Sequence, residues 1–309
     1  MRLGVLGSMV WDRIEHPAGG PVERWGGICY SLAAAAAALP GGWSVRPIIK
    51  VGSDLATEAS SFLESLPGLE LPGGVLETPA PNNRVRLLYR DAHHRDEELT
   101  GGVPPWAWHE LEPLVRGLDA LYVNLISGFE LGLETAVLLR TSFHGPIYAD
   151  LHSLLLGTGT CGRRVPRVLE RADEWLAAFD VVQVNEDELT LLAARTDPWE
   201  FAGGAVSRMV AALLVTLGPE GAAIVARTLE QRPWDMPPGA VHRLRVPSTP
   251  MATAGDPTGC GDVWGATCFV ELMAGQTLAA AVRAANEAAA KNTRHRGADS
   301  LHTFLREAT

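Results

Sequence analysis

The stretch DPTGCGDVWG, residues 256–265, places small residues and an acid at a point where a helix is expected to begin. An apolar run follows Asp262 directly, and Gly275 has the position of a C-cap. A glycine-rich turn before a helix leaves several backbone N–H groups unpaired at the positive end of the helix dipole. Gly259, Cys260 and Gly261 are small enough to let a phosphate approach those amides, which predicts an anion-binding turn.

The acid in this stretch needs a different explanation. A carboxylate repels phosphate, so Asp262 is not expected to be a phosphate ligand. It fits a general base beside the phosphate, which takes the proton of an attacking hydroxyl. The alternative is that Asp262 only caps the helix. The motif alone leaves both interpretations open.

The elements that must position this turn follow from the hydrophobic pattern. Short apolar runs, typical of buried strands, alternate with helix-like segments, and this order predicts a mainly parallel sheet covered on both faces. Ligands of such sheets bind beyond the carboxyl ends of the strands. The strand-like runs span 3–10, 45–52, 118–127, 146–151, 179–185, 212–218 and 221–227, and the helix-like segments include 30–40, 56–68, 165–179 and 186–195.

Two segments depart from the alternation. Residues 82–103 read as a strand, a polar turn and a second extended piece, which predicts a hairpin or flap outside the main sheet. An ordinary surface excursion is the alternative. The proline-rich segment 231–250 is expected to be irregular chain.

Size and composition exclude several classes of protein. The chain has 309 residues, which suits one large α/β domain or two small ones. Its net charge of −10 disfavours nucleic-acid binding, although a local cleft for an anionic substrate is compatible with it. The four cysteines form no CxxC pair, which favours reduced thiols in the cytoplasm. Neither a signal peptide nor an apolar run of about 18 residues is recognised, so no membrane association is expected.

The sequence DPTGCGD resembles the C-terminal signature of the ribokinase/PfkB family of carbohydrate and nucleoside kinases. The resemblance implies that Asp262 is the catalytic base, and that the amides of Gly259, Cys260 and Gly261 form the anion hole. Pro257 stands where threonine is usual and Cys260 where alanine is usual. Both are small enough to keep the turn.

Further motifs resemble the family in the same order along the chain, from about residue 3 to residue 297. VNEDE at 184–188 implies that Asn185 and Glu188 help to hold hydrated magnesium and phosphate, although an N-capped helix would look the same. VTLGPEG at 215–221 resembles the family's nucleotide-binding turn, and AANEAAA at 284–290 resembles the helix beside the adenine pocket. The nucleotide contacts implied are Thr216, Gly218, Gly221 and Asn286.

The N-terminal motifs imply the acceptor site. GSMVWD at 7–12 resembles the family's first strand, so Asp12 is expected to bind substrate hydroxyls. In WGGICYS, Gly26 and Gly27 match the family's glycine pair, whereas Ser31 replaces the usual asparagine and suggests a substrate unlike plain ribose. His152 follows a strand where many members carry other polar residues, and its role is open.

The resemblance implies a ribokinase-like three-layer α/β/α sandwich, a single kinase domain over 1–309, and a small β lid within 11–25 and 82–103. It implies ATP and Mg²⁺ as cofactors, leaves a monovalent cation open, and implies a homodimer through the lid. The expected activity is transfer of the γ-phosphate to a hydroxyl of a sugar or sugar-like substrate. A nucleoside kinase and a non-catalytic sugar- or nucleotide-binding protein are the alternatives. A Rossmann dehydrogenase is disfavoured, because no GxGxxG follows the first strand.

Overall fold

A computed structural model describes the chain except for residues 16–19, 90–94, 249–254 and 308–309. Its central sheet has the strand order β14-β13-β12-β11-β8-β7-β1-β3-β4. The strands are β1 (Arg2–Glu15), β3 (Ser44–Gly52), β4 (Val75–Thr78), β7 (Ala120–Asn124), β8 (Ile147–Asp150), β11 (Val181–Asn185), β12 (Ala212–Thr216), β13 (Ala222–Ala226) and β14 (His242–Val246).

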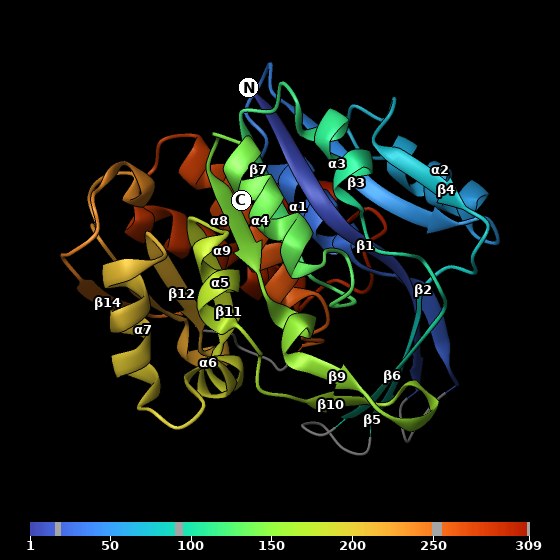
Figure 1. Ribbon diagram of the computed structural model, residues 1–309. Helices are drawn as coiled ribbons and strands as arrows, with labels where there is room; N and C mark the ends of the chain where they lie inside the picture. The colour runs from blue at the N-terminus through green and yellow to red at the C-terminus, as the bar shows by residue number, and fades with distance from the viewer. Residues whose placement is uncertain (16–19, 90–94, 249–254, 308–309) are drawn as a thin grey trace.

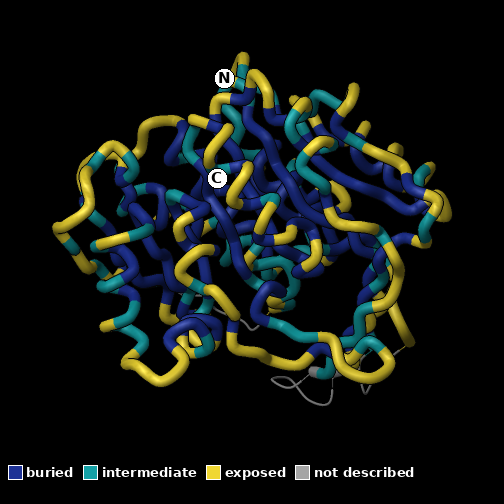
Figure 2. Tube along the Cα trace, viewed as in Figure 1, coloured by how far each residue is buried: buried dark blue, intermediate teal, exposed yellow. Residues whose placement is uncertain are grey.

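The central sheet is parallel from β4 to β12, and antiparallel at β13 and β14. Every residue of β7 is buried, as are all four of β8, because helices cover both faces of a parallel sheet. Figure 2 shows this as dark blue strands through the middle of the molecule. The carboxyl ends of β7, β8, β11 and β12 therefore lie at one edge.

Helices form the outer two layers (Figure 1). The core on one face includes α1 (Ile28–Ala38), α2 (Ala56–Glu64), α8 (Cys260–Met273), α9 (Leu278–Asn292) and α10 (Leu301–Glu307). The core on the other includes α3 (Trp108–Val115), α4 (Leu133–Ser142), α5 (Ala172–Ala177), α6 (Glu186–Ala193) and α7 (Pro198–Arg208). These layers confirm the predicted three-layer α/β/α sandwich.

A small second sheet grows out of the first strand, as Figure 1 shows. The first half of β1 pairs with β3 and β7, whereas its second half pairs with β2 (Val22–Gly27) and β5 (Arg84–Tyr89), and β5 pairs with β6 (Arg95–Thr100). Asp12, Ile14 and Val85 are buried on one face of this sheet, and Arg13 and Arg86 are exposed on the other. The predicted small β sheet is confirmed, and the parts of 11–25 and 82–103 at 16–19 and 90–94 lie outside the described residues.

A further hairpin of β9 (Leu156–Thr158) and β10 (Arg164–Pro166) reaches the small sheet. Arg163 forms an antiparallel bridge with Glu98 on β6, and its guanidinium lies 3.3 Å from Asp96. The long helix predicted over 165–179 is therefore wrong in its first part, because 164–166 is a strand and α5 begins at Ala172. The segment 231–250, predicted to be irregular, contains β14.

Among the described residues, no helix combines the length and the apolar character that crossing a bilayer requires.

Candidate active site

The glycine-rich turn leads into α8 as the sequence predicts. Gly259 is the N-cap residue with φ 75°, a left-handed conformation that favours glycine, and a Cβ there would lie 2.3 Å from the ring of Tyr30. The amide of Cys260 donates to the carbonyl of Pro257 at 3.1 Å. No described residue accepts a hydrogen bond from the amide of Gly261, so this donor of the predicted anion hole is available at the positive end of the helix.

The thiol of Cys260 points away from this donor. Its sulfur lies 3.4 Å from the carbonyl oxygen of Ala289 and 3.4 Å from Nδ2 of Asn292, both on α9. Burial raises the pKa of Cys260 to about 11. Cys260 is therefore a neutral packing group. Its backbone amide, predicted as a donor of the anion hole, is engaged by the carbonyl of Pro257, which leaves the amide of Gly261 as the available donor.

Two buried polar side chains hold Asp262. Nδ2 of Asn124 donates to Oδ1 of Asp262 at 2.7 Å and to Oγ of Ser31 at 3.0 Å. Oγ of Ser31 in turn donates to the backbone carbonyl of Asp262 at 3.3 Å. Asn124 and Ser31 are both fully buried, so this network fixes the orientation of the Asp262 carboxylate from the protein interior. Ser31, predicted as a substrate contact, has its hydroxyl engaged here.

Asn124 was not found by sequence reasoning. It is the last residue of β7, at the carboxyl edge of the sheet, in the run ALYVN. The available signal was a polar residue at the end of an apolar strand, where side chains turn toward a ligand site. The same signal marks Asp150 on β8 and Asn185 on β11, which the structure places at the same edge.

A glutamine connects the turn to the neighbouring strands. Nε2 of Gln183 donates to Oδ2 of Asp150 at 2.9 Å and to the carbonyl of Gly261 at 3.1 Å. Burial raises the pKa of Asp150 well above its ordinary value, and the nearby Glu188 and Asp262 raise it further. The carboxylates of Asp150, Glu188 and Asp262 therefore gather at this edge.

Asn185 and Glu188 form the start of α6. Oδ1 of Asn185 accepts from the amide of Glu188 at 2.8 Å, and Oε2 of Glu188 accepts from the amide of Asn185 at 2.7 Å, which is a reciprocal capping box. Nδ1 of His152 lies 3.2 Å from Oε1 of Glu188. Burial alone lowers the pKa of His152, but Glu188 and the other acids nearby outweigh it and raise the pKa to about 10.

The predicted acceptor residues lie on the small sheet. Asp12 is 5% exposed, and a Cβ on Gly26 would lie 1.8 Å from its Oδ2, so only glycine leaves room for this carboxylate. Gly27, with φ 58°, turns the chain into α1. Burial raises the pKa of the Tyr30 phenol, and Asp12 and Asp262 both raise it further. The predicted base and the predicted acceptor-binding acid therefore lie around the same phenol.

The predicted nucleotide contacts lie further along the edge. Thr216 is the register partner of Asn185 at the ends of β12 and β11, and Gly218 (φ 56°) and Gly221 (φ 98°) form the following turn. Asn286 differs from them, because it is buried and its amide is fully used. Its Oδ1 accepts from the indole of Trp264 at 2.7 Å, and its Nδ2 donates to the carbonyls of Val246 and Pro247.

The side chains at this edge suit a hydrated ion better than a directly bound one. No group of three His, Cys, Asp or Glu side chains in the described parts of the chain is arranged to hold a metal ion. Both oxygens of Glu188 accept protein hydrogen bonds, so it would act on Mg²⁺ through water. Mg²⁺ commonly keeps several waters and binds substrate phosphates in this way.

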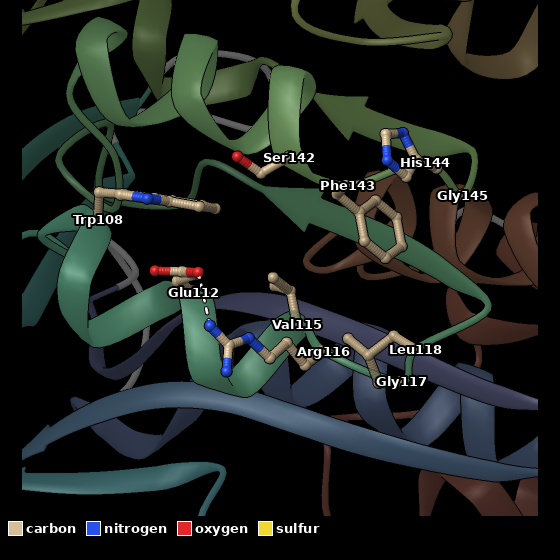
Figure 3. Close-up of a pocket in the computed structure, with 10 residues that line it drawn as sticks. All are labelled: Trp108, Glu112, Val115, Arg116, Gly117, Leu118, Ser142, Phe143, His144 and Gly145. Carbon is tan, nitrogen blue, oxygen red and sulfur yellow. Dashed lines mark hydrogen bonds and ion pairs between the residues drawn. The ribbon is translucent and has the colours of Figure 1, made fainter.

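A concavity lies at the opposite edge of the sheet, before the starts of β7 and β8 (Figure 3). It has a volume of about 340 Å³ and lies between α3 and α4. Glu112 and Arg116 form a 2.7 Å ion pair there, and Trp108 and Phe143 border it. None of the predicted site residues lines this groove.

Comparison with known proteins places this geometry in context. Residues 162–303 match the family described as pfkB family carbohydrate kinase. A search of curated proteins finds no match to the chain. A pyrophosphate-dependent kinase of the ribokinase family, solved with sulfate, shares 18% identity and superposes with a TM-score of 0.78, covering 96% of each chain.

Two further solved structures share the fold. A ribokinase from Arabidopsis thaliana, complexed with ribose and ATP, is 17% identical, with a TM-score of 0.71 and 98% of each chain covered. A nucleoside kinase from Burkholderia thailandensis, complexed with inosine, is 17% identical, with a TM-score of 0.72, covering 100% of this chain and 96% of its own. The sequence match over 162–303, together with a ribokinase-like fold along the whole chain, confirms the predicted resemblance to the ribokinase/PfkB family.

Proposed function

We propose that this protein is an ATP-dependent phosphotransferase that transfers the γ-phosphoryl group to a hydroxyl of a sugar or sugar-like acceptor. The observation that carries the proposal is the placement of Asp262, held by Asn124 at 2.7 Å, in the first turn of α8 beside the available amide of Gly261. The family match includes this turn and the Asn185–Glu188 motif. An Escherichia coli structure with this fold holds ATP and Mg²⁺, which supports the choice of donor.

The proposed reaction places the acceptor hydroxyl between Asp12 and Asp262. Asp262 takes the hydroxyl proton while the acceptor oxygen forms a bond to the γ-phosphorus. The bond from that phosphorus to the β–γ bridging oxygen breaks, and its electron pair leaves with ADP. The amides at the start of α8 stabilise the charge on the transferring oxygens, so catalysis is mainly positioning and electrostatics.

The remaining residues would serve the donor and the lid. Glu188 and Asn185 would orient hydrated Mg²⁺, which neutralises phosphate charge, and Thr216, Gly218 and Gly221 would contact the nucleotide. The small sheet of β2, β5, β6 and the second half of β1 would act as a lid that excludes competing water. The single kinase domain, the homodimer through this lid, the cytoplasmic location and a monovalent cation stay predictions from the resemblance.

A screen of acceptors tests the proposal. The protein is incubated with Mg²⁺ and either ATP or pyrophosphate, against monosaccharides, inositols and nucleosides, and release of ADP or phosphate is measured. The expected result is acceptor-dependent ADP release with a sugar or polyol. Release only with nucleosides would favour the nucleoside kinase, and release only from pyrophosphate would overturn the choice of donor. Thermal stabilisation by a sugar or nucleotide, with no turnover on any acceptor, would indicate a binding protein.

A further inference from the structure

An ion pair joins the small sheet to the catalytic turn, which we define as residues 256–262. Nη2 of Arg24 on β2 lies 3.2 Å from Oδ2 of Asp256, the first residue of that turn. The two side chains are 11% and 23% exposed, so the pair is largely shielded from solvent. It links two elements that are distant in sequence and that carry the proposed acceptor site and the proposed anion hole.

Asp256 controls the shape of the catalytic turn. Its Oδ1 accepts from the amide of Thr258 at 2.9 Å, and its own amide donates to the carbonyl of Thr293 on the segment after α9. Burial raises the pKa of Asp256, but the bonds from Thr258 and Arg24 outweigh it and lower the pKa overall. An ionised Asp256 therefore fixes the backbone immediately before Gly259, and its position depends on what holds the other oxygen.

The side chain of Arg24 is closely packed. It is the register partner of Asp12, so both side chains leave the same face of the small sheet. Gly297 has φ 86°, and a Cβ there would lie 3.1 Å from Cδ of Arg24, so the arginine stem crosses this glycine closely. By contrast, Arg84 on β5 is 42% exposed and pairs with Asp54 at the surface.

The phenol of Tyr30 is influenced both by the Arg24 guanidinium and by the proposed site carboxylates. Arg24 lowers the pKa of the Tyr30 phenol, which burial dominates, while Asp12, Asp256 and Asp262 all raise it. Arg24 and these three acids therefore act on the same phenol, and Asp256 is the acid that Arg24 contacts directly. A phosphoryl group entering this field would otherwise face several negative charges close together.

We propose that Arg24 is a positioning residue for phosphoryl transfer, in which its guanidinium is the built-in cation of the catalytic turn and couples that turn to the strand carrying Asp12. The inference rests on the proposed function. Its physical content is that loss of the guanidinium leaves Asp256 without its cation, shifts the Gly259–Gly261 amides, and so slows the chemical step. Displacements of about 1 Å at a reaction centre can reduce rates on the order of 10²-fold.

The test compares Arg24→Ala, Asp256→Asn, the double variant and the matched surface control Arg84→Ala, all in the full chain. With ATP, Mg²⁺ and the best acceptor, kcat of Arg24→Ala should fall on the order of 10²-fold, while Arg84→Ala stays within about twofold of the wild type, because exposed ion pairs contribute little. Millimolar guanidinium chloride should restore kcat of Arg24→Ala at least several-fold, and urea, which has a similar shape but no charge, should not. The double variant should lose no more than Arg24→Ala and should not respond to guanidinium.

Wild-type kcat in Arg24→Ala, an equal loss in Arg84→Ala, or a loss that guanidinium leaves unchanged would overturn the positioning role. A wild type that transfers phosphoryl groups to no acceptor is a different failure, that of the proposed function. The melting temperatures of the same four variants then test the ion pair between Arg24 and Asp256 separately from catalysis. If the decrease in melting temperature of the double variant equals the sum of the two single decreases, coupling between Arg24 and Asp256 is contradicted.

Discussion

The side-chain nitrogen Nδ2 of Asn124 lies 2.7 Å from Oδ1 of Asp262, and both residues belong to one network with Ser31. The network comes from three elements, because Asn124 ends β7, Ser31 lies on α1 and Asp262 lies on α8. A carboxylate held in this way has its orientation set before any ligand arrives. Such preorganisation is what a proposed general base requires.

Asn124→Leu should therefore reduce kcat while leaving the KM of both substrates near the wild-type value. The variant keeps the volume but removes a hydrogen bond to a charged group, which contributes about 1.5–3 kcal/mol. That range corresponds to a loss of about 10- to 10²-fold in rate. Steady-state kinetics with the best acceptor give both constants, and a melting curve shows whether the variant is folded.

The matched control for this prediction is Ser31→Ala. It removes the second acceptor of Asn124 and the hydrogen bond from Ser31 to the backbone carbonyl of Asp262, but leaves the Asn124–Asp262 bond in place. Its kcat should stay closer to the wild type than that of Asn124→Leu. A folded Asn124→Leu with undiminished kcat would show that Asp262 does not depend on this bond.

Gly26→Ala should weaken binding of the acceptor. The new methyl group would lie 1.8 Å from Oδ2 of Asp12, so the carboxylate must move away from its place on the small sheet. The KM of the acceptor should rise at least about tenfold, the effect of losing one well-placed hydrogen-bonding group at a hydroxyl. Gly20→Ala is the control, because a Cβ there meets nothing within 4 Å. An unchanged KM in Gly26→Ala would contradict the role given to Asp12.

Asn286→Leu should reduce the stability of the folded protein more than it affects the KM for ATP. Its amide satisfies the indole of Trp264 and the carbonyls of Val246 and Pro247. Each buried polar group left unpaired costs about 1–3 kcal/mol. Chemical denaturation should therefore show a clear loss in the free energy of unfolding, with the KM for ATP changed by less than about threefold in the folded protein. A large rise in that KM at unchanged stability would support Asn286 as a direct nucleotide contact.

The parallel sheet and its ligand edge were predictable because buried parallel strands have continuous apolar runs, such as LYVN and VVQVN. The glycine-rich turn into α8 was predictable because small residues directly before an apolar run mark the start of a helix, whereas anion binding by this turn stays a prediction. The length of β1 was not predictable from the sequence, because Asp12 and Arg13 interrupt its apolar pattern. They belong to a second sheet that forms only by pairing with β2 and β5.

The residues that we propose to position the site were not predictable for a similar reason. Arg24 and Asn124 have no neighbours in sequence that mark them, since their partners Asp256 and Asp262 are brought to them by the fold. Asn286 shows the reverse case. Its place in a family motif suggested a ligand contact, whereas three partners from distant segments engage its amide. Local patterns identify the residue types at a site, and tertiary contacts decide which of their atoms remain available.

The central claim is that Asp262 deprotonates the acceptor, and Asp262→Asn tests it most directly, since the two side chains have nearly the same shape. ADP release with the best acceptor is measured for the variant and the wild type, together with the dissociation constant of ATP. The account predicts a loss of about 10²–10⁴-fold in kcat, the range for a general base, with binding of ATP preserved. A variant that keeps most of its turnover would contradict the assignment of Asp262 as the base.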